Sequence, residues 1–251
     1  FFDFKLHYSA GYIVKFGRGS NEALASILRH EAAYMALARM LGLRVHADLV
    51  LLKRALFIPR FDRQVTGGGV LRLGQESIAT LTGNPGFDAV PSHDEVCGQL
   101  LRQCIHPLAE VLEYIKRDVA NLALGNKDNH ARNTAVQRDF SGGIRLTPLY
   151  DFAPMYLHPD GIARRIRWEG NDSSAPDWNR VIDKVCEMAQ ALREEKRLPS
   201  AQKKALREVC RPALVEGLRQ MAEPLKKIAA HGTDFGLEPA VHAHLRLGIE
   251  A

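Results

Sequence analysis

The sequence lacks the features that would place the protein in an oxidising compartment or across a membrane. It has four cysteines and no Cys-x-x-Cys pair, which excludes a disulfide scaffold. Cys97 and Cys104 lie seven residues apart, on one face of a helix, where a mutual disulfide does not form, so we interpret them as buried free thiols. No apolar run reaches the roughly 18 residues of a membrane-spanning helix. The sequence therefore predicts a soluble cytoplasmic protein with no membrane partner.

The first residues also lack the pattern of a secretory signal. Asp3 and Lys5 interrupt the stretch that would have to be apolar. The chain starts at Phe1 without a methionine. We interpret it as a fragment whose natural beginning is missing.

The charge of the chain is only mildly unbalanced. There are 34 Lys and Arg residues against 29 Asp and Glu residues, which gives a formal charge of +5, spread along 251 residues. A nucleic-acid-binding domain usually gathers such charge into a stripe, so direct contact with nucleic acid is not expected. With 46% hydrophobic and 25% charged residues, the composition excludes a disordered or fibrous chain. The length allows one large domain or two smaller lobes.

The periodicity predicts a strand-rich first third followed by a mostly helical remainder. A strand is predicted at Tyr12–Phe16, and apolar residues recur at helical spacing from Leu24 to Leu41, before Gly42. Further strands are predicted at Leu49–Leu52 and Ala55–Ile58, with a loop or hairpin tip at Gly67–Gly69. The remaining predicted elements are helices over Glu95–Ile105 and Pro107–Leu124, extended pieces at Asn133–Val136 and Gly143–Leu146, a helix starting at Trp178, and one from Leu206 to about Ile228.

The segment Gly125–Asn133 is the most informative part of the sequence. It is densely polar, yet it directly follows a strongly apolar helix. Asp128 and Asn133 have the Asp-x-x-x-x-Asn spacing of a kinase catalytic loop, in which the Asp accepts the proton of the attacking hydroxyl and the Asn holds a metal ion. The alternative is a polar loop built from Asx turns.

A second candidate site residue is Asp151, which stands between apolar neighbours at the end of a predicted strand. A carboxylate in such surroundings is costly to bury unless something pairs with it. A divalent cation would do so, because carboxylate, amide and phosphate oxygens are the ligands that Mg²⁺ prefers. Asp151-Phe152 also matches the first two residues of the kinase Asp-Phe-Gly motif, with Ala153 in place of Gly. The alternative is an Asp that caps the next turn.

Two further charges lie in the first third of the chain. Lys15 is in the middle of the predicted strand, as is the kinase lysine that pairs nucleotide phosphates. Glu31 follows sixteen residues later in the predicted helix, where a carboxylate would orient that lysine. Each residue taken alone could be a solvated surface charge. Strand Lys, helix Glu, Asp-x4-Asn loop and Asp-Phe nevertheless occur in the order of a kinase.

These segments resemble the HipA-like serine/threonine kinases, the toxins of bacterial toxin–antitoxin modules. The resemblance rests on Tyr12–Phe16, on Phe57–Arg63, whose Arg-Phe-Asp-Arg string is similar to the family's hinge between lobes, and on Gly125–Asn133 together with Leu146–Asp151. The pattern Gly-Asn-x-Asp-x-His-x-x-Asn is the most specific part, because eukaryotic-type kinases carry His-Arg-Asp instead. The resemblance covers roughly residues 12 to 155. It implies an α+β, two-lobed kinase-like fold with an N-lobe over residues 1–60 and a helical C-lobe over residues 61–251.

The resemblance implies a role for each matching residue. Asp128 would be the catalytic base for a Ser or Thr hydroxyl, while Asn133 and Asp151 would hold Mg²⁺. The residues implied to bind ATP are Lys15 with its partner Glu31, then Pro59, Arg60 and Phe61 around the adenine, and His130, Asn133 and Asp151 near the phosphates.

The resemblance also implies partners and reveals departures. Family members phosphorylate proteins, in known cases aminoacyl-tRNA synthetases, inhibit growth or translation, and are restrained by a DNA-binding antitoxin. The family carries a Gly- and Ser-containing phosphate loop before the strand lysine, whereas only Ser9-Ala10-Gly11 precedes Tyr12. The regulation of the protein and its contact with an antitoxin therefore stay open.

Two other functions fit the same residues. A small-molecule phosphotransferase of the aminoglycoside or choline kinase type shares the Asp-x4-Asn loop and the later metal-binding Asp. An inactive kinase fold could serve as a binding module in a repressor complex. The basic and aromatic run Arg164–Trp168 is interpreted as an activation-segment-like stretch beside the site, with contact to a peptide or nucleic acid as the alternative.

Overall fold

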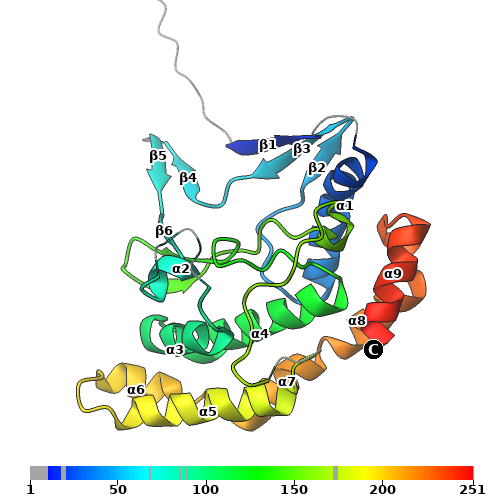
Figure 1. The fold of residues 1–251 in the computed structure, drawn as a ribbon. Coiled ribbons are helices and arrows are strands. Elements are labelled where there is room, and N and C mark those ends of the chain that lie inside the picture. The colour runs from blue at the N-terminus through cyan, green and yellow to red at the C-terminus, as the bar shows by residue number, and fades with distance from the viewer. Residues whose placement is uncertain are drawn as a thin grey trace, which may run out of the picture.

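The strands form three small antiparallel sheets. The computed structural model describes residues 11–17, 21–67, 69–84, 86, 88, 90–171 and 175–250. Within them, the first sheet has the order β1 (Tyr12–Phe16), β3 (Ala55–Pro59), β2 (Val50–Leu52). The second is the hairpin of β4 (Arg63–Thr66) and β5 (Gly69–Arg72), and the third has the order β6 (Gly74–Ser77), β7 (Ala135–Arg138), β8 (Ile144–Leu146). The first sheet lies at one end of the molecule (Figure 1).

Helices make up most of the rest of the described chain. They are α1 (Glu22–Met40), α2 (Ile78–Leu81), α3 (His93–Gln103), α4 (Pro107–Ala123), α5 (Trp178–Glu194), α6 (Ser200–Leu206), α7 (Arg211–Arg219), α8 (Ala222–His231) and α9 (Pro239–Glu250). Short 3₁₀ helices occur at Met155–Leu157 and Gly232–Phe235. The sheet of β1, β2 and β3 and the pair α5 and α6 lie at opposite ends of the molecule (Figure 1).

Local sequence signals explain where the site-bearing helices begin. The side chain of Asn21 accepts a hydrogen bond from Leu24 N at 3.2 Å and so caps α1. Ser92 and Glu95 form a reciprocal capping box at the start of α3. Pro107 stands in the first turn of α4, where its missing N–H costs nothing. Gly125 ends this helix in the left-handed region, with φ of +66°.

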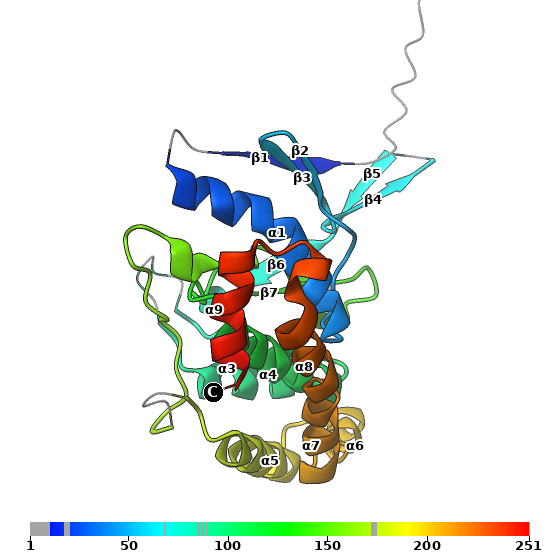
Figure 2. The ribbon, with the colours of Figure 1, turned by 90° about the vertical axis from the view of Figure 1, so that its right-hand side faces the viewer.

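Two apolar cores hold the elements together, and both include residues of α4. One core gathers buried residues of α3, α4 and α5, with Ile166 and Trp168 from the segment that follows Asp151. The other joins α1 and the end of α4 to residues of α8 and α9. In Figure 2, α8 and α9 stand in front of α4 and of the lower end of α1. The helix that carries Glu31 is therefore packed against the C-terminal part of the chain.

The predicted elements were confirmed apart from two details. The helix predicted from Leu206 to about Ile228 was wrong, because the segment is divided among the end of α6, α7 and α8. Pro212 stands at the start of α7, and a proline cannot occupy a helix interior without losing a hydrogen bond, so a new helix begins there. The strand predicted immediately before Asp151 was also wrong, since β8 ends at Leu146 and Thr147–Tyr150 forms no strand.

Other predictions concern the cysteines, the membrane and the lobes. Cys97 and Cys104 are buried and free, as predicted. In the part of the chain that the structure describes, no helix has both the length and the apolar character needed to cross a membrane. The division at residues 60 and 61 into N-lobe and C-lobe stays a prediction.

Candidate active site

The structure brings together a lysine and two carboxylates from three distant segments. Lys15 in β1 lies with its Nζ 2.7 Å from Oε1 and 3.0 Å from Oε2 of Glu31 in α1. The same Nζ also donates a hydrogen bond to Oδ1 of Asp151, which is 136 residues away in sequence. The predicted pairing of Lys15 with Glu31 is therefore confirmed, and Asp151 joins it.

Burial and neighbouring charges have opposite effects on the pKa values in this group. Burial lowers the pKa of Lys15, but Glu31 and Asp151 raise it by more, so the pKa lies above its ordinary value of 10.5. Burial raises the pKa of Glu31 above 4.5, and the nearby Lys15 offsets only part of this effect. Lys15 is consequently a fixed positive charge at neutral pH, held by one buried carboxylate and by the more exposed Asp151.

A cavity of about 320 Å³ adjoins this lysine. Pro59, Arg60 and Phe61, predicted to lie near adenine, all line it together with Lys15, Glu31 and Asp151. The other lining residues are mostly apolar and were not predicted: Ile13, Met35, His46, Ala47, Leu49, Ile58, Asp62, Gln75, Leu149 and Tyr150. An apolar cavity with a few convergent charges is the usual form of a small-molecule site.

The segment where the predicted hinge lies is fixed by polar contacts. Arg60 donates through Nε to Oδ1 of Asp62 at 2.7 Å, and its backbone N donates to the carbonyl of Gly11 at 2.9 Å. The carbonyl of Phe61 accepts a hydrogen bond from Gln137 Nε2 in β7 at 3.3 Å. The ring of Phe61 lies 5.9 Å from that of Tyr150, measured between centroids. These contacts tie one wall of the cavity to the segment that carries Asp151.

The predicted catalytic loop is a compact turn stabilised by its own amide side chains. Nδ2 of Asn133 donates to the carbonyl of Asp128 at 2.9 Å, and Asp128 N donates to Oδ1 of Asn126 at 3.4 Å. Asn126 is in turn held by Asn121 in α4, whose Oδ1 accepts from Nδ2 of Asn126 at 2.9 Å. His130 Nε2 lies 3.6 Å from Oδ1 of Asp128. The two ends of the Asp-x4-Asn spacing are therefore side by side.

A smaller cavity of about 30 Å³ lies between this loop and Asp151. Asp128, Asn133 and Asp151 all line it. Asp151 lines the larger cavity as well, so it lies between the two. It also adopts the left-handed backbone region with φ of +55°, which is uncommon for a residue other than glycine and is best tolerated by Asp and Asn.

The donors around the smaller cavity fit a magnesium ion held together with phosphate groups. The hydrogen bond of Nδ2 to the Asp128 carbonyl leaves Oδ1 of Asn133 as its ligand atom, and Asp151 supplies a carboxylate. In the described part of the chain, no group of three or more His, Cys, Asp or Glu side chains could hold a metal ion. The Asp151 carboxylate and the Asn133 amide oxygen fit Mg²⁺, which is usually bound by one or two carboxylates plus substrate phosphates.

Two neighbouring residues were missed in the sequence. Tyr150 donates from its hydroxyl to the carbonyl of Arg132 at 2.7 Å, and burial raises its pKa to about 12. Asn129 is buried between the catalytic loop and the segment that follows Asp151. Both residues lie directly beside predicted site residues, and adjacency was the signal that could have found them. Ser9 and Ala10, which precede Gly11, lie outside the described residues.

Comparison of the fold with solved structures defines its class. The structure resembles HipA of Shewanella oneidensis, solved in a complex with HipB and operator DNA, with a TM-score of 0.61 and 23% sequence identity. The match covers 95% of this chain and 56% of the HipA chain. The predicted α+β, kinase-like fold is thereby confirmed.

The sequence itself then gives the family. The model of the HipA-like C-terminal domain matches residues 5–214, and the chain belongs to that family. It is also 30% identical over 112 residues to the candidate kinase Y4mE of Sinorhizobium fredii. That alignment covers 42% of this chain and 26% of Y4mE. The chain thus spans about half of HipA and matches about a quarter of Y4mE.

Proposed function

We propose that the protein is an ATP-dependent serine/threonine protein kinase of the HipA type. The observation that carries the proposal is the contact of Lys15 with both Glu31 and Asp151, next to the loop that holds Asp128 and Asn133. Folding brings these residues together from β1, α1 and two later loops. The family and the kinase-like fold support the same reading.

The residues of the larger cavity would bind the nucleotide. Lys15 carries a positive charge that suits phosphate oxygens, and Glu31 fixes its position from the buried side. Pro59, Arg60 and Phe61 line the apolar part of the cavity, where their backbone groups would meet the adenine. His130 lies beside Asp128 and would face the phosphates.

The residues of the smaller cavity would carry out the transfer. Asp128 would accept the proton of the acceptor hydroxyl, and its orientation depends on the hydrogen bonds of its backbone to Asn126 and Asn133. Asn133 and Asp151 would hold Mg²⁺, which when bound neutralises charge on the transferred phosphoryl group. The contribution of the protein is then mainly positioning of the two reactants.

The acceptor and the partners are proposed on the same basis. We propose a protein hydroxyl as acceptor, in a translation factor such as an aminoacyl-tRNA synthetase, with inhibition of growth as the result. A DNA-binding antitoxin is proposed as partner, supported by the complex of the Shewanella HipA with HipB and operator DNA. Direct contact of this chain with nucleic acid is not part of the proposal.

The test is transfer of radiolabel from ATP in the presence of Mg²⁺, with cell proteins and small alcohols or aminoglycosides offered in parallel. We expect a labelled protein band with the wild type and none with Asp128→Asn. Label on a small alcohol alone would favour the small-molecule phosphotransferase. Absence of any transfer by an ATP-binding protein would favour the inactive binding module.

The matched control for Asp128→Asn is Asp160→Asn, because Asp160 is an exposed carboxylate of the following segment. We expect Asp160→Asn to keep normal transfer. Normal turnover by Asp128→Asn would show that the assigned base is wrong.

A further inference from the structure

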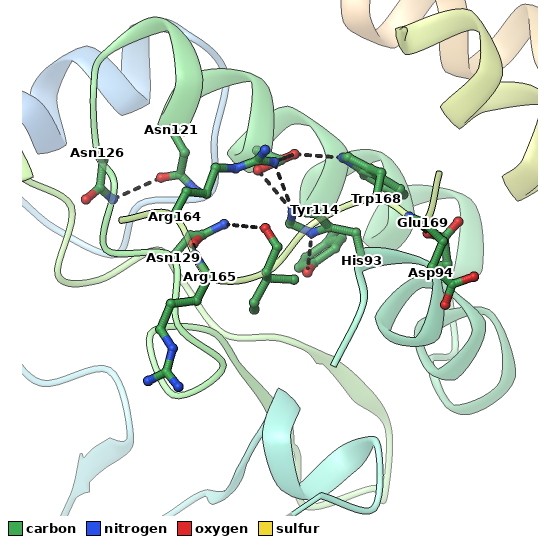
Figure 3. Close-up of polar contacts among 12 residues, drawn as sticks. His93, Asp94, Tyr114, Asn121, Asn126, Asn129, Arg164, Arg165, Trp168 and Glu169 are labelled. Atoms are coloured by element: carbon green, nitrogen blue, oxygen red, sulfur yellow. Dashed lines mark hydrogen bonds and ion pairs between the residues drawn. The ribbon is translucent and has the colours of Figure 1, made fainter. Parts of the chain in front are cut away.

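The segment Arg164–Glu169, named here the anchored segment, is held at each residue by groups from other elements. Its ends and its middle contact the start of α3, the interior of α4 and the predicted catalytic loop (Figure 3). The carbonyl of Arg167 accepts a hydrogen bond from His93 N at 3.0 Å. Glu169 N donates to Oδ2 of Asp94 at 2.8 Å, and its side chain accepts from Ser92 at 2.8 Å.

Asp118 in α4 is the centre of these contacts. One of its oxygens, Oδ2, accepts hydrogen bonds from Nη2 of Arg164 at 2.6 Å and from Nε1 of Trp168 at 2.8 Å. Oδ1 lies 3.4 Å from Nε2 of His93, whose ring stacks on Trp168 with centroids 4.7 Å apart. Asp118 is only 2% exposed, so its charge is balanced inside the protein and not by water.

Asn129 links the same segment to the catalytic loop. Its Oδ1 accepts from the backbone N of Arg165 at 2.8 Å, and its Nδ2 donates to the carbonyl of Ile166 at 3.0 Å. One amide side chain therefore bonds the backbone of two consecutive residues of the anchored segment. Asn129 directly follows Asp128, so the anchored segment and the proposed base are held in a fixed relation.

The chemistry of this stretch differs from that of a phosphorylation-dependent segment. In many kinases a phosphate on the activation loop orders it by pairing with an arginine. Residues 152–171 contain no serine or threonine, and the one tyrosine among them, Tyr156, stacks on His244. Here the arginine is Arg164, and the anion that it pairs with is the carboxylate of Asp118. The charge that a phosphate would supply is already built into α4.

We propose that Asp118 is a positioning residue that holds the anchored segment against the catalytic loop without phosphorylation. This inference rests on the proposed kinase function, because the anchored segment would then be the surface beside which the acceptor protein lies. Asn129 transmits the arrangement to the loop of Asp128. The acceptor platform is consequently assembled as soon as the chain has folded.

The first test measures order in the segment without using activity. The backbone amides of Arg165 and Glu169, which are bonded to Asn129 and Asp94, are followed by hydrogen exchange in phosphatase-treated protein. We expect both to be protected in the wild type and to exchange at least about tenfold faster in Asp118→Asn. Loss of protection on phosphatase treatment, or unchanged protection in Asp118→Asn, would overturn the proposal. Phosphatase treatment also covers Ser173 and Ser174, which lie outside the described residues.

The matched control is Glu110→Gln, since Glu110 is a second carboxylate of α4 that is also 2% exposed. It pairs with Arg44 and with the backbone of Leu146, and its recorded contacts are away from the anchored segment. We expect Glu110→Gln to destabilise the protein while amides 165 and 169 keep their protection. If Asp118→Asn does not fold, Asn129→Ala replaces it, because that variant removes the acceptor of the Arg165 amide and leaves the buried charge pair intact.

The second test separates positioning from nucleotide binding. In Asp118→Asn we expect kcat/KM for the acceptor protein to fall by about 100-fold, because misplacement by about 1 Å is enough for that loss. KM for ATP is expected to change much less, since Asp118 lies at the edge of the smaller cavity but contacts neither Lys15 nor the larger cavity. An equal loss for ATP and for acceptor would mean a general structural role and would contradict the proposal.

The two proposals can fail separately. If the wild type transfers no phosphate to any acceptor, the proposed function is wrong, but the exchange of amides 165 and 169 still decides whether Asp118 anchors the segment. If transfer occurs and Asp118→Asn has normal kinetics for the acceptor, the kinase proposal stands and the positioning role is wrong.

Discussion

Two groups of ion-paired side chains in this protein have the same kind of charges but differ in their exposure to water. At the Lys15 site, the side chains of Lys15 and Asp151 are 33% and 42% exposed. In the network of the anchored segment, Arg164 and Asp118 are 9% and 2% exposed. An ion pair that borders a cavity can exchange one partner for a ligand at small cost, whereas a buried pair cannot. We infer that the Lys15 group binds a ligand and that the Asp118 network holds the anchored segment in place.

The two groups of charges should differ most in their effect on the free energy of unfolding. Removing one partner of a buried ion pair leaves an uncompensated charge, so we expect Asp118→Asn to lower the free energy of unfolding by about 3–5 kcal/mol. Asp151→Asn removes a half-exposed partner and should lower it by less than about 1 kcal/mol. Urea unfolding monitored by tryptophan fluorescence measures both. Equal losses in the two variants would remove the distinction drawn between the regions.

Activity should not follow the order of the stability losses. Asp151 contacts Lys15 and lines both cavities, so Asp151→Asn removes charge where the phosphates and Mg²⁺ would lie. We expect phosphoryl transfer to fall by at least about 100-fold, a typical cost of removing one preorganised electrostatic group. The measurement is the rate of transfer as a function of Mg²⁺ concentration. A variant that reached the wild-type rate at high Mg²⁺ would show that Asp151 contributes to metal affinity alone.

Glu31 sharpens the comparison because it is buried but belongs to the binding group. Burial raises its pKa, which means that its charged form is costly to keep inside the protein. Lys15 is partly exposed and keeps Asp151 as a partner, so a neutral glutamine of the same shape should change the free energy of unfolding by less than about 1 kcal/mol. Loss of the charge that orients Lys15 should raise KM for ATP by about tenfold, the effect of about 1.4 kcal/mol. The two quantities are measured on the same Glu31→Gln preparation, and a stability loss as large as that of Asp118→Asn would contradict the assignment.

The smallest expected effect is at the predicted hinge. The hydrogen bond from Arg60 lowers the pKa of Asp62 below its ordinary value of 3.8, although burial opposes the shift. Stabilisation from a lowered pKa is present above pH 3.8 and is lost as the pH falls through the pKa of the folded state. At neutral pH we expect Asp62→Asn to cost about 0.5 kcal/mol, as exposed pairs do.

The difference between wild type and Asp62→Asn should vanish in acid. Thermal unfolding from pH 7 to pH 3 measures it, with Arg60→Gln and the double variant completing a double-mutant cycle. A difference that grew towards acid would contradict the assigned sign.

Much of the first region could be predicted because its signals are local. The strand at Tyr12–Phe16 and the helix that follows placed Lys15 and Glu31 on adjacent elements, and kinase-like spacing indicated Asp128, Asn133 and Asp151. The apolar wall of the cavity could not be predicted. His46, Leu49 and Tyr150 reach it through tertiary packing, and no periodicity in the sequence records which distant segments will meet.

The buried network around Asp118 could not be predicted, because an amphipathic pattern assigns charged residues to solvent. The periodicity of α4 marks one apolar face, and its other face carries Glu110, Glu113, Arg117 and Asp118, which such a pattern assigns to solvent. All four are buried, because the segments around Leu146 and Trp168 cover that face and supply partners for the charges. The break at Pro212, in contrast, was visible in the sequence and overlooked.

The attachment of α1 to the C-terminal part of the chain bears on synthesis. Arg29 in α1 donates to Glu238 at 3.0 Å, and Nε2 of His30 accepts from the backbone N of Glu238 at 3.1 Å. Met221, Ile228, Val241 and Leu245 complete the core around this helix. During synthesis the residues of α1 leave the ribosome long before the C-terminal residues that they contact, and domains generally fold as units. We therefore expect a nascent chain to be inactive until residues near 245 have left the exit tunnel.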